Sequence, residues 1–333
     1  MTESQSRTGV LLLQLGTPDD PSPAAVRRYL REFLSDRRVI EAPRVVWWPV
    51  LNFQVLRTRP RQSAEKYRRI WDPRTGSPLL HYTKRQTAEL QKRFSGNFVV
   101  RFAMRYGNPS TQSVLKELIA VGVERIVVLP MYPQYSATTT ASALDALFRA
   151  LLRERRMPAL RIIAPYYVHA AYLDAMAGII REQLAQLTWQ PDHYVLSFHG
   201  IPQKYVERGD PYPWHCEASA KQIAARFGWV EGKWSLTYQS ILGKDPWLQP
   251  YTEATLEKLA RAGNRKVFIA TPGFTADCLE TIDEVGREAR EVFEKAGGAL
   301  FHRCPCPNDH PLWIDGMEKL VREEVGGLEP STP

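Results

Sequence analysis

The chain has 333 residues, enough for two domains of ordinary size, with 44% hydrophobic residues, 24% charged residues and a formal net charge of +8. This composition is that of a globular protein and excludes the disordered and fibrous classes. The first residues lack a signal-peptide pattern, and no apolar run approaches the roughly 20 residues that cross a bilayer. The four cysteines suit reduced thiols better than a disulfide framework, so we expect a cytoplasmic protein.

Apolar runs typical of buried strands alternate with helical stretches along the chain. In chain order, strands are expected at 10–15, 98–104, 125–129, 160–164, 194–198, 234–238 and 266–271, and helices at 137–155, 217–226 and 252–262. The first three strands fall in the amino half and the other four in the carboxyl half. Alternating strands and helices predict parallel sheets flanked by helices, so two such sets predict two similar Rossmann-like α/β domains.

A charged stretch that ends in a proline, 153–158, marks the expected domain boundary. We expect an amino-terminal α/β domain with a pocket lip over 1–157 and a carboxyl-terminal α/β domain over 158–312. The remaining residues, 313–333, are expected to form a helix that packs back on the first domain, followed by a frayed tail.

A nucleotide-binding function is not supported by the turns of this predicted fold. No strand is followed by Gly-x-Gly-x-x-Gly, and no phosphate-binding loop of the Gly-x-x-x-x-Gly-Lys-Ser/Thr type occurs. The turn after the first strand carries Pro18, where a phosphate cradle needs free backbone amides. The function must therefore be argued from the sites rather than from the fold.

The densest basic stretch, 57–69, carries six positive residues against one negative residue and follows an apolar segment, 45–51, that contains Trp47 and Trp48. A basic segment beside indoles suits an anionic membrane surface or an anionic amphiphile, and the pair could form the mouth of a pocket. A solvated basic helix after an ordinary core segment is the alternative. Nucleic acid is not expected as a partner, because zinc-finger, RNP and GxxG patterns are missing.

Two segments place titratable residues at the ends of predicted strands. His199 ends the run 194–198 and precedes a Gly-Ile-Pro turn, and the segment 272–281 follows another strand and contains Glu280. Open α/β sheets place their ligand crevice at the carboxyl ends of their strands. A histidine there can take up protons or bind a metal, although a structural histidine is the plain alternative.

These two segments resemble those of ferrochelatases, which insert ferrous iron into a porphyrin at the end of haem synthesis. The resemblance runs in family order from about residue 9 to about residue 325 and includes 11–18, 29–36, 76–79, 104–107, 132–136 and 238–240 leading to 247–248. Each motif alone is weak, but the series is specific. It implies a chelatase-like fold and a lyase that removes two pyrrole protons as the metal enters.

The resemblance implies that His199 and Glu280 are both the catalytic residues and the metal ligands, without settling which one holds iron and which one moves protons. It also implies a proton or metal relay through Glu284 and Glu288, on a helix that is partly a π-helix. For Glu288, an exposed acidic face balanced by arginines is the alternative. The residues matched to the porphyrin site are Leu15, Arg105, Tyr106, Tyr132, Gln134, Ser136, Trp247 and Phe274.

Departures from the family pattern narrow the expected substrate and cofactors. Leu15 stands where coproporphyrin-using relatives carry a tyrosine, which favours protoporphyrin IX with Fe(II) as the second substrate and protohaem as the product. Ala137 stands where animal relatives carry a cluster cysteine, and no cysteine follows Cys306, so no iron–sulfur cluster and no other cofactor is expected. Cys278 stands where many relatives carry histidine.

Three alternatives stay open: a coproporphyrin ferrochelatase, a cobalt or nickel chelatase of the same superfamily, and a non-catalytic tetrapyrrole or metal carrier. The presence of both His199 and Glu280 favours an enzyme, because a carrier needs no proton acceptor opposite the metal. Metal choice follows availability as much as the ligand set, so it is not fixed by the sequence. An enzyme for protoporphyrin, which dissolves in lipid, is expected to contact the inner face of an anionic membrane peripherally and reversibly.

Overall fold

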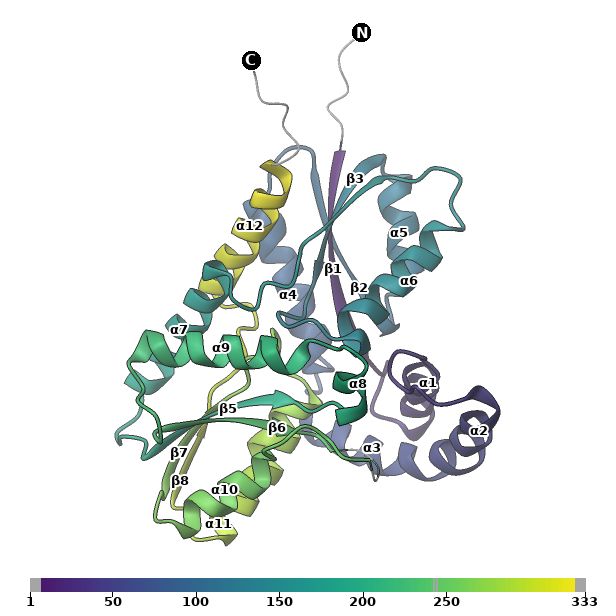
Figure 1. Cartoon of the computed structure of the whole chain (residues 1–333). Helices are drawn as coiled ribbons and strands as arrows, with labels where there is room; N and C mark the ends of the chain where they lie inside the picture. Colours follow the sequence, from purple (N-terminus) through teal and green to yellow (C-terminus); the bar gives the residue numbers. More distant parts are fainter. Residues whose placement is uncertain (1–6, 242, 244, 327–333) are drawn as a thin grey trace. The chain divides into compact units, whose positions relative to one another are not determined.

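The structure, a computed structural model, describes residues 7–326 except residues 242 and 244. Its internal contacts divide the chain into two compact units (Figure 1). The first unit contains the residues up to Tyr132, Ser136–Ala164 and the residues from Ile314 onward, and the second contains Pro133–Tyr135 and Pro165–Trp313. The expected boundary at 157/158 thus lies a few residues before the observed division, and the predicted frayed tail at 327–333 lies outside the described residues.

The first unit is built on a four-stranded parallel sheet in the order β2-β1-β3-β4. Its strands are β1 (Arg7–Thr17), β2 (Phe98–Gly107), β3 (Val123–Pro130) and β4 (Ala159–Ile162). The strand expected at 160–164 was assigned to the second domain, and this assignment is wrong. Leu160 and Ile162 pair in register with Ile126 and Val128 of β3, so the run completes the first sheet.

The helices of the first unit either pack against its sheet through an apolar stripe or, like the three between residues 44 and 70, pack mainly with one another and with the helix at 23–34. They are α1 (Pro23–Leu34), α2 (Arg44–Pro49), the π-helix η1 (Val50–Val55), α3 (Leu56–Ile70), α4 (Pro78–Arg93), α5 (Thr111–Ala120), the π-helix η2 (Ala137–Ala141) and α6 (Ser142–Leu151). On one face of the sheet, Leu11 and Leu13 pack with Leu118 of α5 and Leu147 of α6. The helix expected at 137–155 therefore begins as a π-helical segment and ends four residues early.

The last helix, α12 (Pro311–Gly326), lies from Ile314 onward within the first unit. Arg93 at the end of α4 forms an ion pair with Asp315 at 2.7 Å, and Arg322 lies over the ring of Phe94. Among the described residues, no helix combines the length and the apolar character needed to cross a membrane.

The second unit repeats the same topology. Its parallel sheet has the order β6-β5-β7-β8, with β5 (His193–His199), β6 (Trp234–Gln239), β7 (Lys266–Ala270) and β8 (Leu300–Arg303). In Figure 1, α9 lies on one side of this sheet and α10 and α11 lie on the other. The two matching strand orders confirm the prediction of two similar Rossmann-like units, although the short strand β8 was not predicted.

The helices of the second unit are α7 (Ala170–Ala185), α8 (Gln203–Glu207), α9 (Tyr212–Phe227), α10 (Thr252–Arg261), the π-helix η3 (Glu280–Ala289) and α11 (Arg290–Lys295). Val195 of β5 packs with Leu256 of α10, with Val285 and Ala289 of η3 and with Phe293 of α11. Because side chains alternate along a strand, His199 lies on the same face of β5 as Val195. The π-helix η3 therefore covers the face of the sheet that carries His199.

A buried carboxylate ties the end of α1 to the first sheet. Asp36 accepts hydrogen bonds from Ser142 at 2.5 Å and from Tyr106 at 2.8 Å, and it forms an ion pair with Arg105. Burial alone would raise the pKa of Asp36, but the bonds from Ser142 and from the Arg38 amide and the charge of Arg105 outweigh it and hold the pKa below its usual range. The ionised form is thus the form that stabilises the fold.

We expect Asp36→Asn to lower the free energy of unfolding at pH 7 by about 3 kcal/mol, because it leaves the Arg105 charge buried without a partner. A lowered pKa contributes stability above the unfolded value of about 4, and this contribution is lost as the pH falls through the folded value. The difference between the variant and the unsubstituted protein should therefore narrow below about pH 4. Urea unfolding of both proteins between pH 7 and pH 3 measures this difference in the free energy of unfolding.

Asp145→Asn is the matched control, because Asp145 pairs with Arg38 on the surface at 3.0 Å. An exposed pair contributes at most about 1 kcal/mol, so this variant should stay close to the unsubstituted protein. If Asp36→Asn lowers the free energy of unfolding as little as Asp145→Asn does, or by an amount that does not change with pH, then the ionised Asp36 does not stabilise the fold as proposed.

Candidate functional site

The carboxyl edge of the second sheet collects residues from three neighbouring strands. His199 is the last residue of β5, which pairs with β6 on one side and with β7 on the other. Its register partner on β6 is Gln239. The ring centroids of Trp247, in the segment after β6, and of Phe274, in the turn after β7, each lie 6.5 Å from the centroid of the His199 ring. The edge therefore brings together three residues predicted from the sequence.

The tautomer of His199 is set by its own main chain. Its Nδ1 lies 2.6 Å from the carbonyl oxygen of Gly200, and a carbonyl can only accept, so Nδ1 carries the hydrogen. In the neutral ring the lone pair is then on Nε2. His199 can use Nε2 to accept a proton or to bind a metal, because the other nitrogen is already engaged.

Gly200 allows the indole of Trp247 to lie against the end of β5. A Cβ at this position would come within 3.0 Å of the Gln239 carbonyl oxygen and within 3.2 Å of the Trp247 ring. The amide of Gly200 donates to that same carbonyl at 2.8 Å, and Pro202 forms a β-bridge with Trp247. The His-Gly-x-Pro turn thus holds the imidazole and the indole at one strand end.

Glu280 is the first residue of η3 and is half-buried. The thiol of Cys278 lies beside it and hydrogen-bonds to its carboxylate. Burial, together with the nearby charge of Glu280, raises the pKa of Cys278 well above its usual value, so the thiol keeps its proton and donates. Cys278 therefore acts as a neutral donor to Glu280 and not as a thiolate.

The three glutamates spaced along η3 have different surroundings. Ser240, whose φ of 67° places it in the left-handed region, donates to a carboxylate oxygen of Glu284. Glu288 accepts from Arg287 at 2.9 Å, and Arg287 also binds the buried Asp283 at 2.7 Å. The ion pair that the sequence offered as the alternative for Glu288 is thus present, while Glu284 is tied to the end of β6.

Gln239 is a residue that sequence reasoning did not select. Its Oε1 accepts from Ser197 at 2.8 Å, and its buried Nε2 has no hydrogen-bond partner within the described part of the chain. An unpaired buried donor is costly and is often found at functional positions. A polar residue at the end of the strand beside that of His199 was the signal that could have identified it.

Among the other predicted porphyrin-binding residues, those of the first unit gather at the carboxyl end of its sheet. Leu15 is half-buried near the end of β1, Arg105 and Tyr106 are near the end of β2, and Tyr132 follows β3. Tyr106 is fully buried and burial raises its pKa, as it does for Tyr132, whose hydroxyl has no partner within the described residues. Both phenols therefore stay neutral, and Arg105 is engaged by Asp36 and Ser142.

Two predicted residues that follow β3 belong to different units. Ser136, in the first unit, is buried, and its hydroxyl caps the start of η2 by accepting from the Thr138 amide at 3.2 Å. Gln134 lies in the second unit and donates to Ser219 of α9 at 2.9 Å. Contact of these two residues with a porphyrin stays a prediction, as it does for the residues of the first unit.

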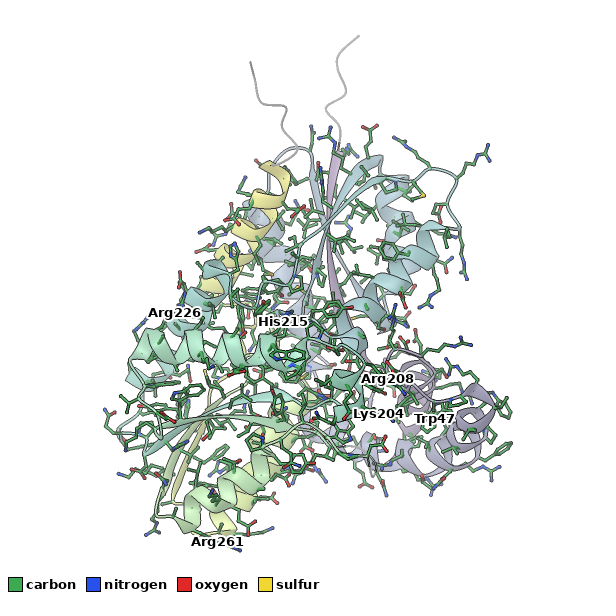
Figure 2. The ribbon with its side chains drawn as sticks, in the orientation of Figure 1. Trp47, Lys204, Arg208, His215, Arg226 and Arg261 are labelled. Carbon is green, nitrogen blue, oxygen red and sulfur yellow. The ribbon has the colours of Figure 1, made fainter. Side chains whose placement is uncertain are left out.

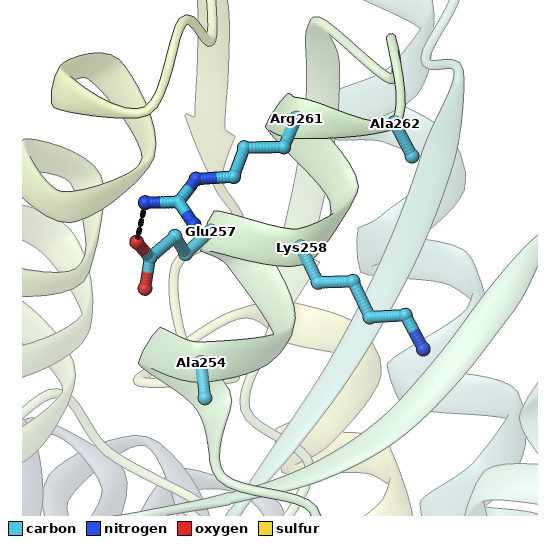
Figure 3. A pocket seen from close by; sticks show the side chains of 5 residues that line it. All are labelled: Ala254, Glu257, Lys258, Arg261 and Ala262. Atoms are coloured by element: carbon cyan, nitrogen blue, oxygen red, sulfur yellow. Dashed lines mark ion pairs between the residues drawn. The ribbon is translucent and has the colours of Figure 1, made fainter.

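A separate hollow of about 410 Å³ lies along α10 (Figure 3). It is lined by Ala254, Glu257, Lys258, Arg261 and Ala262, and Arg261 pairs with Glu257 across one helical turn. None of the predicted site residues lines it. It is an open depression on a solvated helix and carries no chemistry of the predicted kind.

Comparison with known proteins gives one consistent family. The family model for ferrochelatase matches residues 7–325. The ferrochelatase of Mesorhizobium japonicum is 48% identical over 324 residues, which cover 96% of this chain and 92% of the relative. The ferrochelatase of Azoarcus sp. is 46% identical over 332 residues, which cover 99% and 91%.

Solved structures with much lower identity share the fold. SirB from Bacillus subtilis with Fe3+ superposes with a TM-score of 0.56 at 13% identity, over 97% of each chain. CbiX, described as the terminal enzyme for siroheme biosynthesis in denitrifying bacteria, gives a TM-score of 0.51 at 12% identity, over 95% of this chain and 98% of that one.

The family model spans nearly the whole chain, and the relatives are close to half identical along nine-tenths of their length. The chain belongs to the ferrochelatase family and is a metal chelatase that inserts iron into a porphyrin to make haem.

Proposed function

We propose that the porphyrin substrate is protoporphyrin IX and that His199 and Glu280 carry the metallation. The observation that carries the catalytic part is the fixed tautomer of His199, which leaves a basic Nε2 on the sheet face covered by η3. For the substrate, the support is Leu15, a half-buried aliphatic side chain packed against the core of the first unit, which offers a metal no donor atom.

The proposed chemistry has two parts, metal delivery and proton transfer. Ferrous iron accepts imidazole and carboxylate ligands, so Nε2 of His199 and the carboxylate of Glu280 can both take part in metal delivery. Each of the two pyrrole N–H protons needs an acceptor, and a neutral imidazole is a suitable one. Glu284 and Glu288 would relay protons or hydrated cations onward. We propose that no resident cofactor and no iron–sulfur cluster takes part.

The substrate assignment predicts a clear preference in solution. With Fe(II) and no added cofactor, we expect kcat/KM for protoporphyrin IX to exceed that for coproporphyrin by about tenfold or more, which corresponds to about 1.4 kcal/mol of transition-state binding. The change in porphyrin absorption measures both rates. Equal rates or a preference for coproporphyrin would overturn the assignment, and faster insertion of Co(II) or Ni(II) would favour the related chelatases.

The proposed pair predicts a graded mutant series. His199→Ala and Glu280→Gln should each lower kcat by about 10² or more, because each removes a proton-accepting or metal-binding group, while porphyrin binding persists. Glu288→Gln should lower the rate much less, since Glu288 lies about two helical turns further along and is paired with Arg287. Steady-state rates and porphyrin fluorescence quenching separate turnover from binding.

More than about a tenth of the wild-type rate in His199→Ala would remove His199 as the essential base, given the usual size of general-base effects. A larger loss at Glu288 than at Glu280 would move the reacting carboxylate to the far end of η3.

The lip of the first unit, α2 with η1 and the start of α3, has one buried and one exposed apolar side. Trp47 (Figure 2) donates to the Leu34 carbonyl at 2.7 Å and packs with Leu51 and Leu56, so it belongs to the core of the lip. Trp48 and Phe53 are 58% and 57% exposed and meet edge to face at 5.8 Å. Val45 and Val46 are exposed beside them.

We propose that this exposed side rests reversibly on an anionic membrane. Arg57 lies over the Phe53 ring at 5.5 Å, and Arg59, Arg61, Arg68 and Arg69 of α3 are also exposed. Aromatic side chains beside arginines suit the interface of a bilayer, and each arginine near the surface adds about 1 kcal/mol of attraction to anionic lipid. Such contact would place the enzyme where a lipid-soluble porphyrin is concentrated.

Trp48→Ser combined with Phe53→Ser should abolish binding to vesicles that contain phosphatidylserine, while the fold is retained because both side chains are exposed. Binding of the unsubstituted protein should fall as salt rises, since screening shortens the range of the arginine charges. Vesicle co-sedimentation measures both effects.

Phe148→Ser combined with Leu152→Ser, which removes exposed apolar side chains from α6 and from the residue that follows its last turn, is the matched control. Equal vesicle binding by both double variants would show that the lip is not the docking surface. Trp47→Ser should instead destabilise the first unit.

A further inference from the structure

The turn that carries Glu280 is bound by its own side chains. Thr281 is fully buried, and its hydroxyl donates to Oδ1 of Asp277 at 2.9 Å and accepts from the Cys278 amide at 3.0 Å. These two bonds close a loop around Glu280, between the residues that precede it and the one that follows. Because Thr281 is inaccessible, it cannot itself touch a substrate.

A second layer fixes this loop to the rest of the unit. Arg303 of β8 donates to Oδ1 of Asp277 at 2.6 Å. Asn308 donates to Oδ2 of Asp277 at 2.8 Å and accepts from the Asp277 amide at 2.7 Å. Both carboxylate oxygens of Asp277 thus accept hydrogen bonds, and Oδ1 accepts two. Asp277 is a support in this arrangement, bonded to three side chains.

The π-helix needs such a support more than an α-helix does. Segments with i→i+5 bonding are rare and short, and no side chain caps the start of η3, where Leu279 is the N-cap residue. The stem of Arg303 also lies against Gly286, where a Cβ would come within 3.2 Å of the arginine Cδ. Arg303 therefore holds η3 at two points, through Asp277 before its first turn and through Gly286 in its second half.

We propose that Thr281, bonded to Asp277 and through it to Arg303 and Asn308, is a positioning residue that fixes the direction of the Glu280 carboxylate. The inference rests on the proposed role of Glu280 and deepens it. The hydroxyl of Thr281 sets the rotation of the first turn of η3 about its axis, and this rotation sets where the carboxylate of Glu280 lies. A displacement of about 1 Å at a reacting group can lower a rate by about 10².

Thr281→Val tests the proposal, because valine keeps the shape and loses only the hydroxyl. We expect kcat for iron insertion to fall by about tenfold or more while KM for the porphyrin changes by less than about twofold, since porphyrin binding does not depend on the carboxylate direction. Thr281→Ser keeps the hydroxyl and should restore most of the rate.

Thr83→Val is the matched control. Thr83 is also fully buried, and its hydroxyl donates to the Leu79 carbonyl at 2.7 Å within α4 of the first unit. It should lower the melting temperature by about as much as Thr281→Val and leave kcat unchanged. Equal losses of kcat in the two valine variants, or a serine variant as slow as Thr281→Val, would overturn the positioning role.

A crystal structure of Thr281→Val separates this inference from the proposed function. The carboxylate of Glu280 should be displaced while β5 and His199 superpose on the unsubstituted protein. If the carboxylate stays in place, the inference fails, whatever the turnover. If Glu280→Gln keeps its turnover but the carboxylate still moves in Thr281→Val, the proposed role of Glu280 fails and the positioning role stands.

Discussion

The site of the second unit depends on the parallel pairing of β5 with both of its neighbours. The carboxyl ends of parallel strands lie at the same edge of a sheet, so the residues that follow β5, β6 and β7 are brought together there although they are far apart in the chain. His199 meets Trp247 from the segment after β6 and Phe274 from the turn after β7 for this reason. A strand that ran in the opposite direction would bring its amino end, with different side chains, to the same place.

Two buried aspartates and Glu280 have opposite surroundings. Asp36 and Asp277 accept several hydrogen bonds each and face an arginine, so their charge is fully used in holding elements together. Glu280 is half-buried at a helix start, with the neutral Cys278 thiol as the partner that the structure gives it. The carboxylates of Asp36 and Asp277 are taken up by hydrogen bonds and ion pairs within the fold, while the carboxylate of Glu280 has fewer such partners, which suits the proposed role.

The alternation of apolar runs with helical stretches was enough to predict two parallel sheets, because each buried parallel strand is an unbroken run of hydrophobic residues. It could not assign the run at 160–164 to a sheet, since membership is decided by its register with β3. It also missed β8, a four-residue edge strand whose last two residues, His302 and Arg303, are polar. Edge strands need only one apolar side, and their pattern is correspondingly weak.

For the site, the positions of His199 and Glu280 followed from strand ends and from the family motifs. What the sequence could not supply were contacts between residues far apart in the chain, such as Ser240 with Glu284. The sequence also could not show that the adjacent residues Trp47 and Trp48 have different surroundings. One indole is turned into the lip by a bond to the Leu34 carbonyl and the other faces outward, which a local pattern of two adjacent tryptophans does not reveal.

The contact between Gly286 and Arg303 restricts which substitutions the chain can accept at these two positions. A side chain at 286 needs space that the arginine stem occupies, so it becomes acceptable only if residue 303 becomes smaller. A smaller residue at 303 in turn leaves the buried Asp277 without its cation. We therefore expect positions 277, 286 and 303 to covary among related sequences, so that a change at any one of them is accompanied by changes at the other two.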